Sequence, residues 1–122
     1  MSIRLSDTET SEFCISTAAG DNVADSFTVK VQDGKVILYN SNNEVVLGSA
    51  NEWIDLRIEI FKGVGRKTAR IYSNNTLVAS FTSGLSSVNY GDLNKATLYV
   101  SNGSFGKIDI DNIFVGKADK TS

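Results

Sequence analysis

The chain has 122 residues, of which 41% are hydrophobic and 21% are charged, and its formal net charge is −2. This length fits one domain with a hydrophobic core of its own, and the composition excludes a disordered or membrane-embedded polymer. A weakly acidic chain lacks the basic surface that neutralises phosphate groups, so we do not expect nucleic acid as a partner.

The residue types that are missing exclude several kinds of catalytic and metal site. The chain has no histidine, and Cys14 is its only cysteine. Histidine is the commonest acid–base group near neutral pH and the commonest nitrogen ligand of metals, so Ser-His-Asp and Cys-His catalysis are excluded. A lone cysteine forms neither an intrachain disulfide nor a thiolate cluster. We expect Cys14 to be a buried, inert thiol in a short strand.

The first half of the chain is predicted to contain a β-hairpin. Weak strand candidates lie at residues 3–5 and 12–17, and a stronger one at 26–32, where apolar and polar residues alternate. Asp33-Gly34 interrupts this pattern, which then resumes at 35–40. An Asp-Gly pair between β-branched runs favours a type I′ turn, because both of its central residues need positive φ. We therefore predict a hairpin over residues 26–40.

The clearest strand spans residues 53–61, where four apolar residues at alternate positions face three charged ones. The glycine-containing segment 62–67 is expected to be a hairpin tip, because it lacks the spacing of a phosphate-binding loop. The later expected elements are a strand at 68–73, a turn at Asn74-Asn75, a strand at 76–82, a loop with one short helical turn at 83–95, and strands at 96–101 and 105–115.

About nine to eleven short strands at regular spacing predict an all-β fold, either a sandwich or a barrel. We expect one domain over residues 1–122, with an ordered core at 3–116 and a polar C-terminal tail at 117–122. No apolar run approaches the roughly 20 residues that a membrane span needs, so we expect no membrane insertion. The N-terminal residues also lack the apolar region of a signal peptide.

Four segments carry a recognisable strand-and-turn pattern: FTVKVQDGKVILY at 27–39, NEWIDLRIEIF at 51–61, ARIYSNNTLVA at 69–79 and GKIDIDNIFV at 106–115. Together they resemble the concanavalin A-like lectin/glucanase superfamily, in particular its laminin G-like jelly-roll modules. This resemblance implies an antiparallel β-sandwich of jelly-roll type. The resemblance covers residues 13–116 and implies the fold more strongly than a function, because this sandwich hosts lectins, adhesion modules and hydrolases alike.

Members of this superfamily generally have one or two more strands at the N-terminal side. Two explanations fit the shorter start. Residues 3–5 could supply an abbreviated first strand, or another chain could complete the missing edge by strand addition. In the second case, the expected partner is a second copy of the chain, which would make a homo-oligomer through an incomplete sheet edge.

The carboxylates do not form the pattern that a glucanase of this superfamily needs. Glycosidases place two carboxylates about 5–5.5 Å apart for retention, and the resembling glucanases use an E-x-D-x-x-E-like strand that is missing here. Asp55 and Glu59 share a strand face with Arg57 between them, which favours a surface ion network. We predict that the protein is not an enzyme and has no catalytic residues.

In some of the jelly-roll modules that the chain resembles, an aspartate of the closing strand helps to hold a structural calcium ion. Asp111 is the aspartate of this kind here. Calcium takes six to eight oxygen ligands, and the chain has no dense D-x-D-x-D-G loop. Asp111 would need help from backbone carbonyls near the N-terminus. The other role for Asp111 is a buried, hydrogen-bonded turn residue. We predict no cofactor and assign no metal ligand, and a structural calcium ion at Asp111 stays the alternative.

Exposed aromatic residues are the natural platform for a sugar ring. Trp53 is expected to pack in the core or at the rim of the sandwich. Tyr72 and Arg70 are expected on the wet face of a strand, and Tyr90 lies in the loop at 83–95. Loop and wet-face aromatics are better binding candidates than core ones, so Tyr72, Tyr90 and Arg70 are the predicted ligand-binding residues.

These observations favour a non-catalytic binding module, carbohydrate-binding or adhesive, in an extracellular or surface-associated protein that is part of a larger assembly. The alternative is a structural protein of a surface layer, fibre or virion whose partner is protein, including a copy of itself. The missing histidine, the lack of a metal-ligand cluster and the scattered aromatics suit this alternative slightly better than they suit a dedicated lectin. The shorter start also favours the alternative.

Overall fold

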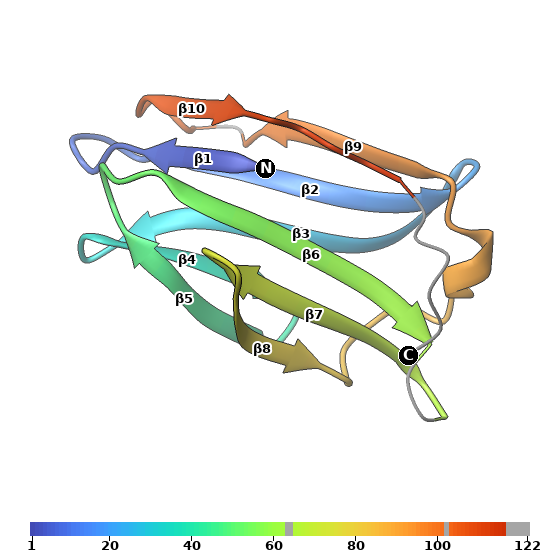
Figure 1. Cartoon of the computed structure of the whole chain (residues 1–122). Coiled ribbons are helices and arrows are strands. Elements are labelled where there is room, and N and C mark those ends of the chain that lie inside the picture. The colour runs from blue at the N-terminus through green and yellow to red at the C-terminus, as the bar shows by residue number, and fades with distance from the viewer. Residues whose placement is uncertain (63–64, 102, 117–122) are drawn as a thin grey trace.

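The computed structural model describes residues 1–62, 65–101 and 103–116. These residues form ten β-strands and one short 3-10 turn (Figure 1). The elements are β1 Ser2–Leu5, β2 Glu12–Ala19, β3 Asn22–Gln32, β4 Lys35–Asn40, β5 Asn43–Ser49, β6 Ile54–Lys62, β7 Lys67–Ser73, β8 Thr76–Phe81, η1 Tyr90–Asp92, β9 Lys95–Val100 and β10 Ile108–Asp111. The expected tail at 117–122 lies outside the described residues.

The strands form two five-stranded antiparallel sheets that pack face to face. Sheet A has the order β10-β1-β6-β7-β8, and sheet B has the order β5-β4-β3-β2-β9. The chain begins in sheet A, builds β2 to β5 in sheet B, returns for β6 to β8, and then places β9 in sheet B and β10 in sheet A (Figure 1). The predicted antiparallel β-sandwich is confirmed.

The core lies between the two sheets because alternate residues of each strand face inward. Sheet A contributes Ile54 and Leu56, each 2% exposed, and sheet B contributes Phe13 and Phe27, both fully buried. The other members of the core cluster are Ile3, Leu5, Val29, Val36, Leu38, Leu47, Ala69, Ile71 and Phe81. No helix within the described residues is long and apolar enough to cross a membrane.

Two predicted turns have the backbone that their residues favour. Asp33 and Gly34 connect β3 to β4 with φ of 52° and 76°, as a type I′ hairpin requires. Asn74 and Asn75 connect β7 to β8 with φ of 51° and 66°, and asparagine tolerates this left-handed region better than most residues. The hairpin predicted over 26–40 is confirmed.

Strands β5 and β10 differ from the expectations. Strand β5 was not expected, because the continuous apolar run Val45-Val46-Leu47 hides the alternation that marks a half-buried strand. In the structure the alternation is present, since Val46 points to solvent and is 52% exposed. Strand β10 ends at Asp111, well before the predicted end at 115. Asn112 has a φ of 54°, which turns the chain out of the extended conformation although the apolar residues continue.

Strand β1 occupies an inner position of sheet A, between β10 and β6. Ile3 lies opposite Ile110 on one side and opposite Ile54 on the other. Residues 3–5 therefore form a strand, and β1 is not an edge of sheet A. The edge strands in the described chain are β10 and β8 of sheet A and β5 and β9 of sheet B.

Replacing Ile3 with alanine should lower the free energy of unfolding by about 2–5 kcal/mol, because a fully buried side chain would leave a cavity between the sheets. The matched control is Leu77→Ala on β8, where the side chain is 49% exposed, and we expect a much smaller loss. Urea unfolding of both variants measures the difference. Equal small losses would contradict the inner position of β1.

Candidate functional site

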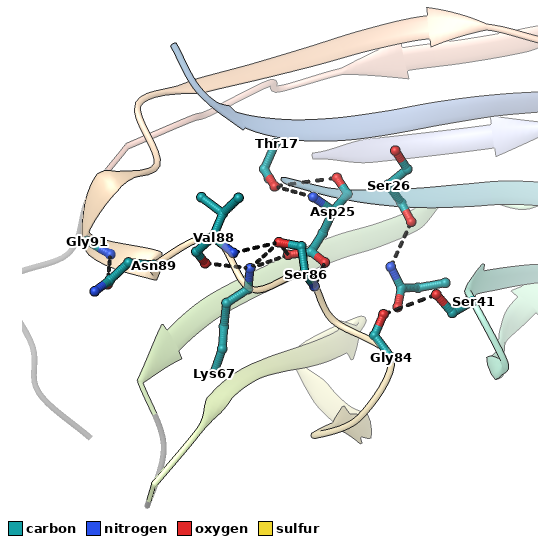
Figure 2. Close-up of polar contacts among 11 residues, drawn as sticks. Thr17, Asp25, Ser26, Ser41, Lys67, Gly84, Ser86, Val88, Asn89 and Gly91 are labelled. Atoms are coloured by element: carbon teal, nitrogen blue, oxygen red, sulfur yellow. Dashed lines mark hydrogen bonds and ion pairs between the residues drawn. The ribbon is translucent and has the colours of Figure 1, made fainter. Parts of the chain in front are cut away.

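A buried ion pair connects the two sheets near one end of the sandwich (Figure 2). Asp25 belongs to β3 of sheet B, and Lys67 begins β7 of sheet A. The Lys67 Nζ lies 2.6 Å from the Asp25 Oδ2, and the side chains are 10% and 2% exposed. Burying two charges is unfavourable unless each is also hydrogen-bonded. The stability of this pair therefore depends on its other hydrogen-bond partners.

Those partners come from the loop between β8 and β9. Besides Asp25, the Lys67 Nζ donates to the Ser86 Oγ at 2.9 Å and to the Val88 carbonyl at 3.0 Å, so its three protons all have acceptors. The Ser86 N–H donates to the Asp25 Oδ1 at 2.7 Å. The ion pair therefore fixes the loop against both sheets as well as joining them (Figure 2).

The start of the same loop is held by a second set of hydrogen bonds. The Ser41 Oγ donates to the Gly84 carbonyl at 3.1 Å, and the Asn43 Nδ2 donates to the Ser83 carbonyl at 2.8 Å. The Ser41 bond attaches the loop to the β4–β5 connection (Figure 2). The Asn43 bond attaches it to the first residue of β5. At the far end, the Asn89 side chain accepts from the Gly91 N–H at 2.9 Å and caps η1.

The fixed loop and the end of the β6–β7 hairpin enclose an open depression of about 500 Å³. The hairpin contributes Lys62 and residues 65–67, and the loop contributes residues 86–91. Tyr90 is 40% exposed there, and Lys62 and Arg66 are also exposed. No carboxylate side chain is among the described residues that line this depression. We call it the Tyr90 depression.

Tyr72 and Arg70 lie elsewhere, on the outer face of sheet A. Tyr72 is half-buried, and the Arg57 guanidinium lies 4.1 Å from the centre of its ring. Arg70 lies in the same way over Phe61, at 4.6 Å. Cation–π contacts of this kind stabilise a sheet face. The structure thus places two of the three predicted binding residues on one face, and places Tyr90 in a separate depression.

The ion network expected along β6 is present in part. The Arg57 Nε lies 3.5 Å from the Glu59 Oε2. Asp55 instead pairs with the amino group of Met1, at 3.6 Å. Both pairs lie on the outer face of sheet A, opposite the inward Ile54 and Leu56, as the alternation of the strand requires.

A second, smaller depression of about 320 Å³ lies on sheet A beside Trp53 and Asp111. Trp53 is 48% exposed, and the Arg4 guanidinium lies 4.6 Å from its ring centre, so Trp53 packs at the rim. The Asp111 Oδ1 accepts from the Asn112 N–H at 2.8 Å. Across residues 1–62, 65–101 and 103–116, no three acidic or thiol side chains converge in a way that could hold a metal ion.

No motif in the sequence marks Lys62 and Arg66 as binding residues. Both belong to the glycine-containing segment 62–67, whose spacing predicts only a hairpin tip. The available signal was the presence of three basic residues at one tip, Lys62, Arg66 and Lys67, in a chain that is acidic overall. Asp25, which lies far away in the sequence, pairs with Lys67 and so buries it. Lys62 and Arg66 stay exposed.

The chain was compared with family models, curated proteins and solved structures, and nothing matches in any of the three comparisons. The fold and the geometry of the two depressions are therefore the basis for any functional conclusion.

Replacing Lys67 with methionine should lower the free energy of unfolding by about 3–5 kcal/mol, because the Asp25 carboxylate would stay buried without its cation. The double variant Asp25→Asn, Lys67→Met should lose less than the sum of the two single variants, since it removes both charges together. Denaturant unfolding measures this coupling. Lys35→Met on the exposed start of β4 is the control and should have little effect.

If the losses from Asp25→Asn and Lys67→Met simply add, the two side chains do not act as a pair. That result would contradict the role assigned to them in joining the sheets.

Proposed function

We propose that this domain is a non-catalytic carbohydrate-binding module that takes acidic sugars in the Tyr90 depression. One observation supports this most directly. An exposed aromatic ring and two exposed cations, Tyr90, Lys62 and Arg66, line one concave surface with no opposing carboxylate among its described residues.

The chemistry of these side chains suits a charged sugar. A tyrosine ring can pack against the apolar face of a pyranose, and it loses little conformational entropy in doing so. Lysine and arginine pair with carboxylate or sulfate groups by charge-assisted hydrogen bonds. Uronic acids and sulfated sugars have both features, an apolar ring face and an anionic group, so they are the ligand class of this proposal.

The loop that presents Tyr90 is also supported from beneath. Residues Ser86 and Val88 are held by Lys67, which is itself paired with Asp25. A loop that is ordered before binding does not have to lose that conformational freedom when the ligand binds. Lys67 therefore acts as a positioning residue, and Lys62 and Arg66 are left to meet the ligand.

The wider setting belongs to the same proposal. We assign the sandwich to the jelly-roll type of the concanavalin A-like, laminin G-like modules, on the resemblance of its strand segments. In such a setting the domain would work outside the cell or on its surface, within a larger assembly. We assign the module no catalytic step, because no carboxylate side chain is among the described residues that line the Tyr90 depression. The carboxylates of Asp25, Glu59 and Asp109 are engaged by Lys67, Arg57 and Arg4.

A second function, structural assembly through protein contacts, is favoured by a different observation. Every residue of strand β9 is exposed, although β9 is part of a sheet. An uncovered strand of this kind is suited to contact with another protein chain.

Replacing Tyr90 with alanine should weaken binding of an acidic oligosaccharide by about 1–2 kcal/mol, roughly five- to thirtyfold, because the stacking platform is lost. The probes are heparin-derived and oligogalacturonate fragments, with neutral cello-oligosaccharides for comparison, titrated by calorimetry. Arg66→Ala should weaken binding of the acidic fragments, and their affinity should fall as salt is raised, because exposed charges are screened.

The matched control is Tyr72→Ala on the outer face of sheet A, which should leave the affinity unchanged. The opposite pattern, with binding lost in Tyr72→Ala and kept in Tyr90→Ala, would move the site to that face. A folded protein that binds none of the charged or neutral fragments would contradict the carbohydrate proposal.

A further inference from the structure

Strand β9 has an apolar face that points inward and yet lies open. Ala96, Leu98 and Val100 lie opposite Thr17, Ile15 and Phe13 of β2. Phe13 is fully buried in the core, and directly opposed residues share a face of the sheet. Leu98 and Val100 therefore belong to the inner face of sheet B, but they remain 37% and 59% exposed.

The backbone of β9 is also open along one side. Strand β9 ends the order of sheet B, and β2 is its sole partner in the described chain. The Ser101 N–H donates toward β2, to the Glu12 carbonyl at 3.2 Å. Hydrogen-bonding direction alternates along an antiparallel strand. The N–H and C=O groups of Leu98 and Val100 therefore point away from β2, toward the open side.

The other edge strands have protection that β9 lacks. Strand β10 has two aspartates, Asp109 and Asp111, within four residues. Strands β5 and β8 both pair with their neighbours through a register shift. Charges and bulges are the usual means of keeping a sheet edge from adding another strand. Strand β9 pairs with β2 without any register shift, and its single charge, Lys95, lies at its first residue.

We propose that the occupant of this edge is β9 of a second copy of the chain, added antiparallel about a twofold axis at Leu98. With this axis, each Ala96 lies opposite Val100 of the second copy, so a small side chain meets a larger one. Leu98 meets Leu98 of the second copy. The two five-stranded B sheets become one continuous sheet, and a symmetric interface of this kind is closed.

The charges near this edge favour the same arrangement. In this register Lys95 lies opposite Ser101 of the second copy. Glu12 neighbours Ser101 within each chain, because its carbonyl accepts from the Ser101 N–H. Lys95 of one copy is therefore directed toward Glu12 of the other, on the outer face, and like charges do not oppose each other directly along the paired strands. Complementary charges of this kind set the register and select the partner.

Light scattering over a dilution series in the micromolar range tests the proposal on the whole chain. We expect twice the mass of the chain, falling to the mass of one chain in Leu98→Lys, because an inward-pointing charge blocks strand addition. The matched control is Leu77→Lys, on exposed edge strand β8 of sheet A. It should keep the doubled mass.

Lys95→Glu is the second variant, because its exposed side chain can change without disturbing the core. It should shift the equilibrium toward the single chain while the circular dichroism spectrum stays unchanged. A wild-type chain that has the mass of one copy throughout would overturn the proposal and would leave the edge of β9 to a strand of a different protein. A doubled mass that persists in folded Leu98→Lys and Lys95→Glu would also overturn it.

Discussion

The buried pair of Asp25 and Lys67 is the interaction on which the arrangement of this sandwich depends most. Moving two charges out of water costs several kcal/mol for each ion, and this cost is offset only when every donor and acceptor has a partner. Here the lysine has three acceptors and the carboxylate also accepts from the Ser86 N–H. Because these partners come from β3, β7 and the loop after β8, the pair is satisfied in one relative placement of all three.

The outer face of sheet A and three of the edge strands are protected from association with other chains by different means. Edge strand β9 has no such protection. The chain has no proline with which to block an edge. Stacked arginines cover Tyr72 and Phe61 on the outer face of sheet A, while aspartates and bulges protect β10, β5 and β8. Strand β9 alone combines regular pairing with an uncovered apolar face, and this contrast is the physical reason for assigning it a partner strand.

The sequence predicted correctly those elements whose structure is determined by residues close together in the chain. The hairpin at Asp33-Gly34 and the alternation of β6 could be predicted from neighbouring residues, because turn chemistry and a half-buried strand act over a few positions. The end of β10 at Asp111 could not be predicted, since the apolar pattern continues and one asparagine φ decides the outcome. The site was harder still. Tyr90 was predicted as a binding residue, but Ser86 and Asp25 are separated by 61 positions, and no short-range pattern connects them.

The two proposals are supported by separate residues, yet they have a joint consequence for binding strength. A single open depression with one tyrosine and two exposed cations offers few contacts, so its affinity for one sugar would be modest. Two copies joined through β9 would hold two such depressions at a fixed separation, because each depression is attached to its own rigid sandwich. When a polymer with repeated acidic units binds one depression, binding at the other becomes intramolecular, and avidity rises without any new contact if the units span the distance. If both proposals hold, an acidic polysaccharide would therefore bind more tightly than a single acidic sugar.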